Sequence, residues 1–448
     1  MKRLIMISIS LLMMTTGLFA QEAQDQMDDK GVYILAAYEF DIDGSTRESA
    51  LIREMDLKAG TEFETLEDLE QAVSRQQQDL INLRVFNEVS LTLLEGESKG
   101  DDTVYRALVK AEDSWTIYPI PYPKYSSDDG FRLGLKTFYD NAFGTLNDLY
   151  LGLNITFRDD EYYDQWKVTQ WTFNPQLNGV KMGGLQYDFS FMQEYAIDEK
   201  KEDGEYVERY NYHSTSVSVG TRLNFGLENK FYYRIQPSIG ANYAYSGLGY
   251  EGNEEPLFLG FNHSAGYSKV DWMGNFRQGF STSVGNSLRY VHSSHKKDEF
   301  KTSIDGNVNY YHILNPRMNY TTRLYGIMSL NDELTGLGSN LRGVEGSTMF
   351  GRGGLFYSND MNFAVIKWKG VGEAQFQPFF DIGFAIEEGS SMDWGEDLRY
   401  STGADFILYL DKLKGLHARA SIGVDLSSDL PFNDINKYGI EITSSLAY

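Results

Sequence analysis

Apolar and polar side chains alternate in residues 147–157, and this alternation limits the fold more than any other feature of the chain. Successive side chains of a β-strand point to opposite faces, so every second residue lies on the same face. The pattern is typical of a membrane-spanning β-barrel, in which one row faces lipid and the other lines a wet interior. Residues 185–191 and 231–245 repeat it. The apolar row of the first segment is Leu149, Leu151, Leu153, Ile155 and Phe157, and the other row is Tyr150, Gly152, Asn154 and Thr156.

Composition and turn spacing favour a transmembrane barrel over a large soluble β-sandwich or β-helix, although these folds also alternate. Aromatic residues make up 14% of the chain, and Tyr and Phe suit the girdles at membrane surfaces. Beyond residue 113, segments of about ten residues recur between turn clusters such as Gly252-Asn253 and Asn331-Asp332. We therefore predict a mainly β protein, in which residues 113–448 form a transmembrane antiparallel β-barrel of about sixteen strands after one small α+β domain.

Residues 1–20 have the pattern of a secretory signal peptide. Lys2 and Arg3 precede an apolar run, and the segment ends at the small residue Ala20. A retained membrane anchor is the alternative, but a spanning helix needs about 20 apolar residues and this run is shorter. The polar residues 21–32 follow as a flexible lead. We expect the chain to be exported, with the cell outer membrane as its destination.

Charge and cysteine content exclude several functions. The formal net charge is −24, and an acidic chain is repelled by a phosphate backbone, so we expect no nucleic-acid partner. The chain has no cysteine, which excludes disulfides, thiolate catalysis and thiolate metal sites.

The sequence also lacks an arrangement that predicts catalysis. A hydrolase would need a histidine or paired carboxylates at one rim of the barrel, whereas the 6 histidines are scattered along the chain. His292 and His295 have a spacing that suits a metal, but such a loop pair without a third ligand is more often polar surface. No nucleophile elbow or phosphate-binding loop is present. We expect no enzymatic activity, no metal site and no cofactor.

The segment 33–112 has a mixed pattern with its own small core. Ser45 and Thr46 are suitable caps for the first of two helices, and apolar residues of the second fall at helical spacing. Three prolines in residues 114–125 follow this segment, and we expect them to lie outside any hydrogen-bonded ladder. The expected elements are a strand at 33–40, helices at 47–56 and 65–82, and strands at Val85–Leu94 and Thr103–Val109.

Three sets of residues carry a resemblance to a known family. The segment 40–93 resembles a POTRA domain, LRGVEG at 341–346 is similar to a lumenal lid-loop motif, and PFFDIGF at 378–384 is similar to a strand motif. In this order they resemble the BamA/TamA-like outer-membrane insertase and transporter superfamily. The POTRA core and turn residues are Gly44, Leu57, Gly60, Leu83, Phe86 and Val89. The lid motif is Leu341, Arg342 and Gly343, and the strand motif is Phe379, Asp381 and Gly383.

The resemblance implies that the lid loop folds into the barrel and that its arginine meets lumenal acidic and aromatic groups. Side-chain parity points Asp381 into the lumen, so we expect it to pair with Arg342. The alternative is a solvated loop arginine. Two residues depart from the family pattern. Val344 stands where an aromatic is expected, and the glutamate expected on the twelfth strand is replaced by Asn362.

The resemblance further implies protein insertion or translocation across the outer membrane, with the POTRA domain in the periplasm. The expected partners are the lipid bilayer, unfolded outer-membrane or secreted client proteins, and a periplasmic partner at the POTRA domain. A client strand would pair with the POTRA edge by β-augmentation and then meet the seam between the first and last barrel strands. A passive channel or porin is the alternative, and an outer-membrane hydrolase is a more distant one. The client, and the choice between a general assembly factor and a dedicated exporter, stay open.

Overall fold

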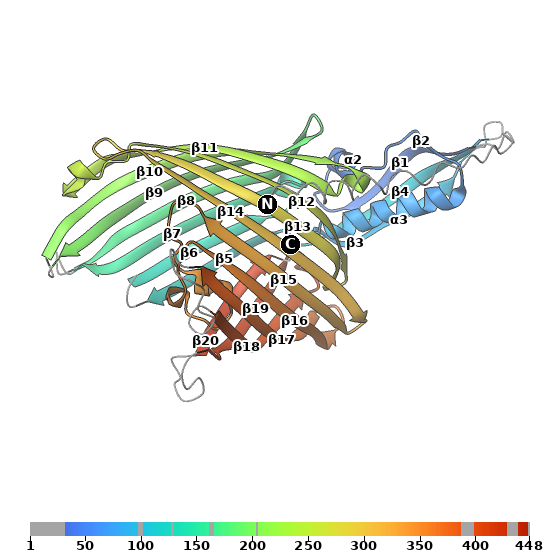
Figure 1. Cartoon of the computed structure of the whole chain (residues 1–448). Coiled ribbons are helices and arrows are strands. Elements are labelled where there is room, and N and C mark those ends of the chain that lie inside the picture. Colours follow the sequence, from blue (N-terminus) through green and yellow to red (C-terminus); the bar gives the residue numbers. More distant parts are fainter. Residues whose placement is uncertain are drawn as a thin grey trace, which may run out of the picture.

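The chain forms one large and one small β-sheet, shown in Figure 1. The computed structural model describes residues 32–96, 102–126, 130–160, 165–202, 205–386, 398–427 and 438–446. The expected signal peptide lies outside these residues, as does the flexible lead up to residue 31. The larger sheet contains sixteen strands and the smaller one contains four. The expectation of a mainly β chain with a small α+β part at its N-terminal end is therefore confirmed.

The smaller sheet and two helices form the N-terminal unit, residues 33–113. Strand order in the sheet is β2-β1-β4-β3, and the helices pack on it. The short strand β2 is absent from the sequence prediction. Strand β4 lies inside the sheet between β1 and β3, so of the two strands that follow α3 only β3 lies at an edge. The elements are β1 (Tyr33–Asp43), α2 (Glu48–Glu54), β2 (Thr61–Phe63), α3 (Leu66–Asn82), β3 (Phe86–Glu95) and β4 (Thr103–Asp113).

Helix α3 shows how the local sequence determines this unit. Thr65 caps the helix, because its hydroxyl accepts a hydrogen bond from the Asp68 N–H at 3.1 Å. Leu69, Val73 and Leu80 recur at helical spacing and are buried against the sheet. The predicted helix therefore forms, with its apolar face in the core.

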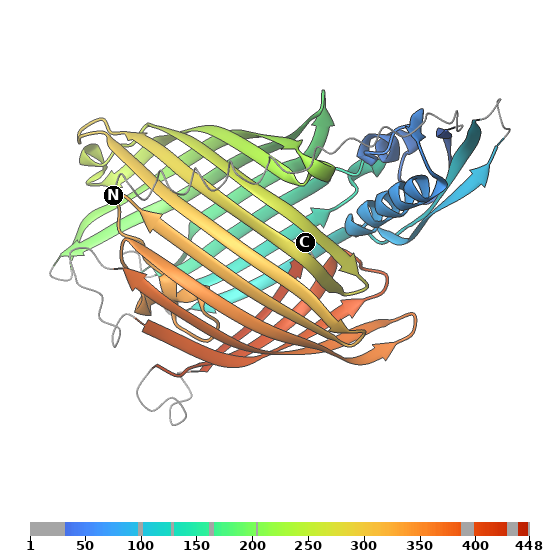
Figure 2. The same ribbon diagram turned by 45° about the vertical axis from the view of Figure 1, so that its right-hand side comes forward.

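The larger sheet is a meander in which each strand pairs antiparallel with its neighbours in sequence. Its strands wrap around a lumen, as the two views in Figures 1 and 2 show. Strands β5 and β20 are the two ends of the sheet, and no pairing joins them within the described part of the chain. The first eight strands are β5 (Ile117–Ser126), β6 (Gly130–Tyr139), β7 (Asp148–Asp160), β8 (Gln165–Met182), β9 (Leu185–Glu202), β10 (Glu205–Phe225), β11 (Phe231–Leu248) and β12 (Leu257–Met273). The remaining eight are β13 (Phe276–His292), β14 (Glu299–Asn315), β15 (Met318–Ser329), β16 (Gly353–Trp368), β17 (Gly372–Ile386), β18 (Leu398–Leu410), β19 (Leu416–Asp425) and β20 (Tyr438–Leu446).

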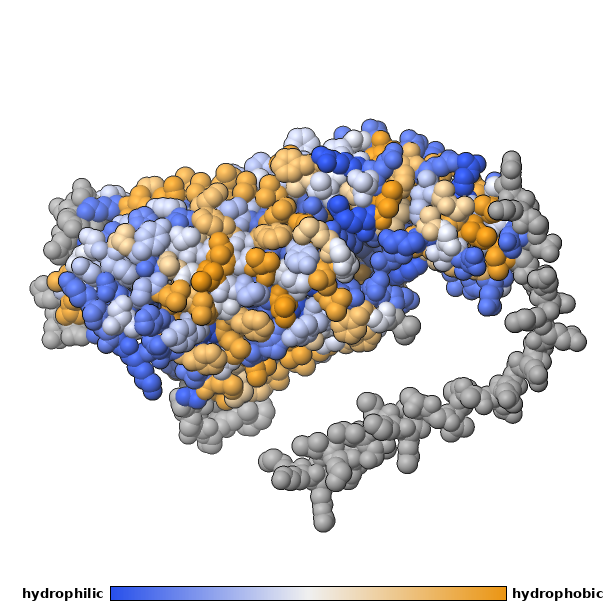
Figure 3. Space-filling view, turned by 90° about the horizontal axis from the view of Figure 1, so that it is seen from above, coloured by the Kyte–Doolittle hydropathy of each residue, from blue (hydrophilic) through white to orange (hydrophobic). Residues whose placement is uncertain are grey.

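The outer wall of this sheet carries the apolar rows that the sequence predicts. Leu151 and Leu153 of β7 and Val217 and Val219 of β10 are exposed on it, whereas Asn154 and Thr172 bond to each other on the opposite face. Figure 3 shows hydrophobic side chains gathered over the barrel wall and hydrophilic ones where the N-terminal unit begins. No helix in the described residues is long and apolar enough to cross a membrane.

Strand β5 corrects one expectation. Its residues Pro119, Pro121 and Pro123 lie within the ladder to β6 rather than outside it. The ladder tolerates them because β5 ends the sheet and the three prolines occupy alternate positions, where their nitrogen faces away from β6.

Candidate functional site in the barrel lumen

The connection between β15 and β16, residues 330–352, folds back against the barrel wall, and we call it the lumenal loop. Its base is closed by two backbone hydrogen bonds between Leu334 and Gly351, with N···O distances of 2.7 and 2.9 Å. Two short 3₁₀ turns follow, η4 (Leu337–Asn340) and η5 (Gly346–Thr348). Apolar side chains of the loop then pack against the wall and bury a small core. Its members are Leu337, Leu341, Val344 and Met349 of the loop, with Phe356 of β16 and Ala385 of β17.

Arg342 at the tip of this loop is held by Asp381 of β17. Its Nε and Nη2 donate to the two carboxylate oxygens of Asp381, at 2.8 and 2.6 Å. The Arg342 backbone N–H also donates to Asp381, at 3.1 Å. Asp381 is fully buried, and the two-point geometry fixes the direction of the guanidinium as well as its position.

Two further aspartates complete a carboxylate cage around the same guanidinium. Nη1 of Arg342 donates to Asp405 of β18 at 3.0 Å and lies 2.6 Å from Asp360 of β16. Asp405 is fully buried and also accepts a hydrogen bond from Arg419 of β19. Phe379 lies beneath the arginine, whose Cζ is 3.8 Å from the centre of the ring. The loop is thus tied to three neighbouring strands, β16, β17 and β18, through one side chain.

Glycines allow the loop to approach the wall this closely. Gly343 has a φ of 80°, and a Cβ there would lie 2.7 Å from the Cα of Gly423 on β19. A Cβ on Gly383 would lie 3.2 Å from the Leu341 side chain and closer still to Phe356. Both motif glycines are therefore required by close packing, and Gly343 also by its positive φ.

Charge balance makes this contact costly to break. Burial alone would lower the pKa of Arg342, but the hydrogen bond with Asp381 and the charges of Asp360, Asp381 and Asp405 raise it. The arginine is therefore positively charged at every relevant pH. Removing one partner from a buried ion pair typically costs about 3–5 kcal/mol, because the other charge is left uncompensated.

The structure places all six motif residues of the lid and strand at this site. Three other members of the site, Asp360, Asp405 and Arg419, are not predicted from the sequence. The acidic position expected on the twelfth strand is placed at Asn362, whereas Asp360, two residues earlier on the same face, makes the contact. Asn362 bonds to Asn319 instead, at 3.5 Å. Strand parity could have pointed to Asp405, because Asp405 lies on the same face of β18 as the small residues Ser401 and Gly403.

The six residues assigned to the POTRA pattern lie in the N-terminal unit, away from the lumenal loop. Gly44 has a φ of 148° and leaves room for Asp113, which accepts a 2.6 Å hydrogen bond from the Ser45 N–H. Gly60 has a φ of 88°, and its N–H donates to Leu35 at 2.7 Å. The other four residues, Leu57, Leu83, Phe86 and Val89, pack in the core of the unit. Their surroundings support a structural role.

The N-terminal unit is docked on one mouth of the barrel through Arg84, which follows helix α3. Arg84 is buried and has a φ of 58°. Its Nε donates to Lys414 O at 2.8 Å, and its Nη1 donates to Gly274 O at 2.7 Å. These carbonyls belong to the turn between β18 and β19 and the turn between β12 and β13. Its Cζ also lies 4.4 Å from the ring centre of Trp272. The Arg84 side chain therefore joins the unit to two separate parts of the rim. Burial lowers the pKa of Arg84 to about 10.

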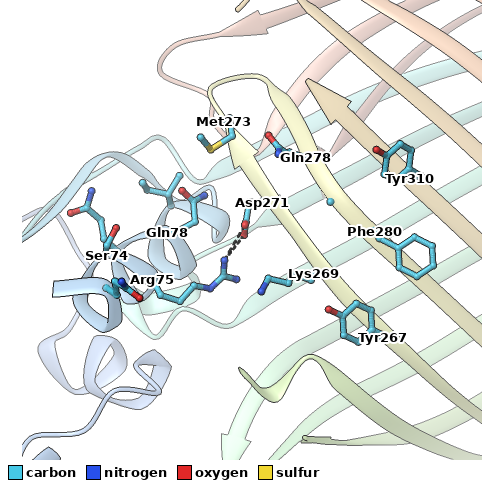
Figure 4. A pocket seen from close by; sticks show the side chains of 14 residues that line it. Ser74, Arg75, Gln78, Tyr267, Lys269, Asp271, Met273, Gln278, Phe280 and Tyr310 are labelled. Carbon is cyan, nitrogen blue, oxygen red and sulfur yellow. Dashed lines mark hydrogen bonds and ion pairs between the residues drawn. The ribbon is translucent and has the colours of Figure 1, made fainter. Parts of the chain in front are cut away.

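Helix α3 adds polar contacts to strand β12, shown close up in Figure 4. Arg75 forms an ion pair with Asp271 at 2.9 Å, and Asn82 donates to the same carboxylate at 2.9 Å. Gln78 donates to Trp272 O at 3.0 Å. The helix and the rim leave between them a cavity of about 750 Å³.

The histidine pair does not form a metal site in the part of the chain that the structure describes. His292 lies 2.9 Å from Asp298, and His295 lies 3.2 Å from Glu254. Each ring contacts a different carboxylate at the exposed end of β13. No group of three metal-binding side chains is formed among the described residues.

The comparisons with known proteins identify the barrel fold. No protein-family model matches the sequence, and no curated protein matches it. CdiB from Acinetobacter baumannii is similar in structure, with a TM-score of 0.57 and 14% identity over 92% of this chain and 73% of that one. CdiB from Escherichia coli has a TM-score of 0.51 and 11% identity over 95% of this chain and 92% of that one. At these identities the likeness shows a shared fold, and this fold agrees with the one that the resemblance in the sequence implies.

Proposed function

We propose that this protein moves polypeptide clients into or across the outer membrane. The observation that carries the proposal is the lumenal loop, which Arg342 fastens to Asp360, Asp381 and Asp405 inside the barrel. A transporter of polypeptides needs such a fastening, because a lumen wide enough for a client must be closed when no client is present.

The proposal places the barrel, residues 113–448, in the lipid bilayer. The exposed apolar rows of β7 and β10 and the polar opposite face support this placement, since one face of a sheet that wraps into a barrel can meet lipid while the other lines a wet lumen. The segment 1–20 would serve as the export signal. The likeness of the fold to CdiB supports the same location.

The N-terminal unit would act as a POTRA domain in the periplasm. The domain that we propose covers residues 33–112. Strand β3 ends its sheet, so one side of β3 has no partner strand among the described residues. Such an edge offers backbone groups to an extended peptide by β-augmentation. Clients, or a periplasmic partner that delivers them, would dock there before they reach the barrel mouth.

Conditional depletion tests the proposal. Cells are depleted of the protein, and the proteins of the outer membrane and of the medium are quantified by mass spectrometry. The proposal expects a defined group of outer-membrane or secreted proteins to be lost and to return with the wild-type gene. A chain without residues 33–112 serves as the second arm and should assemble its barrel without restoring the clients. Unchanged protein profiles together with reduced uptake of small solutes would instead show a porin.

A further inference from the structure

The first barrel strand has an edge that lacks hydrogen-bond donors at three central positions. In the described residues β5 pairs with β6 alone, so its other side is open. Backbone groups of an antiparallel strand alternate between its two sides. Asp140 N–H donates to Thr116 O at 2.9 Å, which places the groups of even-numbered residues on the β6 side. The nitrogens of Pro119, Pro121 and Pro123 therefore face the open edge, and proline has no N–H.

At these three positions, a strand that approaches the edge finds acceptors without donors. In a normal antiparallel ladder, each hydrogen-bonded pair of residues exchanges two bonds, one in each direction. At the three prolines only the bond to the proline carbonyl can form. Edge prolines are one of the devices that prevent a sheet from pairing with another chain. The open side of β5 is thus a poor template for a new strand.

The start of β5 is held to the rim by other contacts. Trp115 N–H, just before the strand, donates to Lys412 O at 3.1 Å, and Arg84 bonds to Lys414 in the same turn. Tyr118 is buried, and its side chain lies close to Gly415 of the same turn. A Cβ built on Gly415 would lie 3.3 Å from the Tyr118 hydroxyl. The barrel is therefore closed at this mouth by the turn between β18 and β19, and this closure does not depend on a ladder along the edge of β5.

The lumen wall carries amide and hydroxyl side chains that can form hydrogen bonds with an extended polypeptide. Asn307 bonds to Ser283 at 2.6 Å, and Asn309 bonds to Ser281 at 3.2 Å. Gln236 bonds to Ser218 at 3.0 Å. These amide and hydroxyl groups lie on the face opposite the apolar rows. They can exchange hydrogen bonds with a passing backbone without binding any one sequence tightly.

We propose that the three prolines prevent the seam from templating client strands, and that clients leave through the lumen as exported polypeptides. This inference rests on the proposed transport function and narrows it from insertion or translocation to translocation. The client class is then a secreted or surface polypeptide, and barrel proteins that need a strand template are excluded.

The test restores the donors at the edge. Pro119→Thr, Pro121→Thr and Pro123→Thr are combined in one variant, and Ile120→Thr with Tyr122→Thr serves as the matched control, because those N–H groups already face β6. A photo-cross-linking residue at Ile117 records which strands pair with β5. Depleted cells that carry each variant are then analysed for exported and for barrel proteins.

The proposal expects depletion to remove exported proteins and to spare barrel proteins. It also expects no client adduct at position 117 of the otherwise wild-type chain, and full export by the control. In the triple variant, new adducts of neighbouring strands should appear while export continues. Client adducts at position 117 of the wild-type background, or loss of barrel proteins on depletion, would overturn it. If the triple variant fails to fold, these two wild-type readouts still decide. If depletion changes neither class of protein, the transport function itself is wrong, which is a separate result.

Discussion

Arg342→Lys should release the lumenal loop without removing its positive charge. The arginine reaches both oxygens of Asp381 and one oxygen of Asp405 at the same time, at 2.6 to 3.0 Å. A lysine has one nitrogen and cannot span these carboxylates. Loss of two charge-assisted hydrogen bonds costs about 3 kcal/mol in total. Such a change raises the fraction of molecules with a detached loop by roughly 100-fold.

Limited proteolysis of the folded, solubilised protein measures this fraction. When opening is fast relative to cleavage, the cleavage rate follows the population of the open form. Sites between residues 335 and 350 should become sensitive in Arg342→Lys, while the barrel keeps its heat-modifiable migration. Arg289→Lys is the control, because Arg289 stacks over Phe258 at 4.8 Å and does not belong to the loop site. Equal cleavage of the loop in wild type and Arg342→Lys would refute the argument that the guanidinium fastens the loop.

Three further substitutions test separate parts of the structure. Gly343→Ala should also expose the loop to protease, because a positive φ costs about 1–2 kcal/mol and the new Cβ meets Gly423. Gly336→Ala shares the positive φ but has open space around it, so it should expose the loop less. Arg84→Ala should loosen the contact of the N-terminal unit with the rim and speed hydrogen exchange in the turn at residues 411–415, whereas Arg106→Ala on the exposed side of the unit should not. Thr65→Ala removes the cap of α3 and should lower the stability of the unit by about 1 kcal/mol, measured by chemical denaturation of the isolated unit if it folds alone.

The sequence predicted those parts of the fold that depend on local periodicity. The alternation of apolar and polar residues located the barrel strands, because successive side chains of a strand point to opposite faces of the sheet. Helical spacing located α3 for the same reason, since Leu69 and Val73 face one core. The strand β2 escaped because three residues carry too short a pattern.

The parts that escaped depend on contacts between distant residues. Asp360, Asp405 and Arg419 lie on three different strands and meet only after the sheet has closed around the loop. Strand parity predicts that each of these side chains faces the lumen. It does not predict which lumenal side chains Arg342 contacts. The prolines of β5 were misjudged for another reason. The rule against proline in a ladder applies to interior strands, and the order of strands, which makes β5 an end strand, was needed to see the exception.

The most direct test of the account is to trap a client inside the barrel. A photo-cross-linking residue replaces Asn362, which shares its face of β16 with Asp360 of the arginine site, and a second chain carries it at Leu151 on the outer wall. Adducts formed in growing cells are identified by mass spectrometry. The account predicts polypeptide adducts of exported proteins at position 362, more of them in the Arg342→Lys background, and none of these proteins at position 151. A lumen that never yields a polypeptide adduct, while small solutes pass through the barrel, would contradict it.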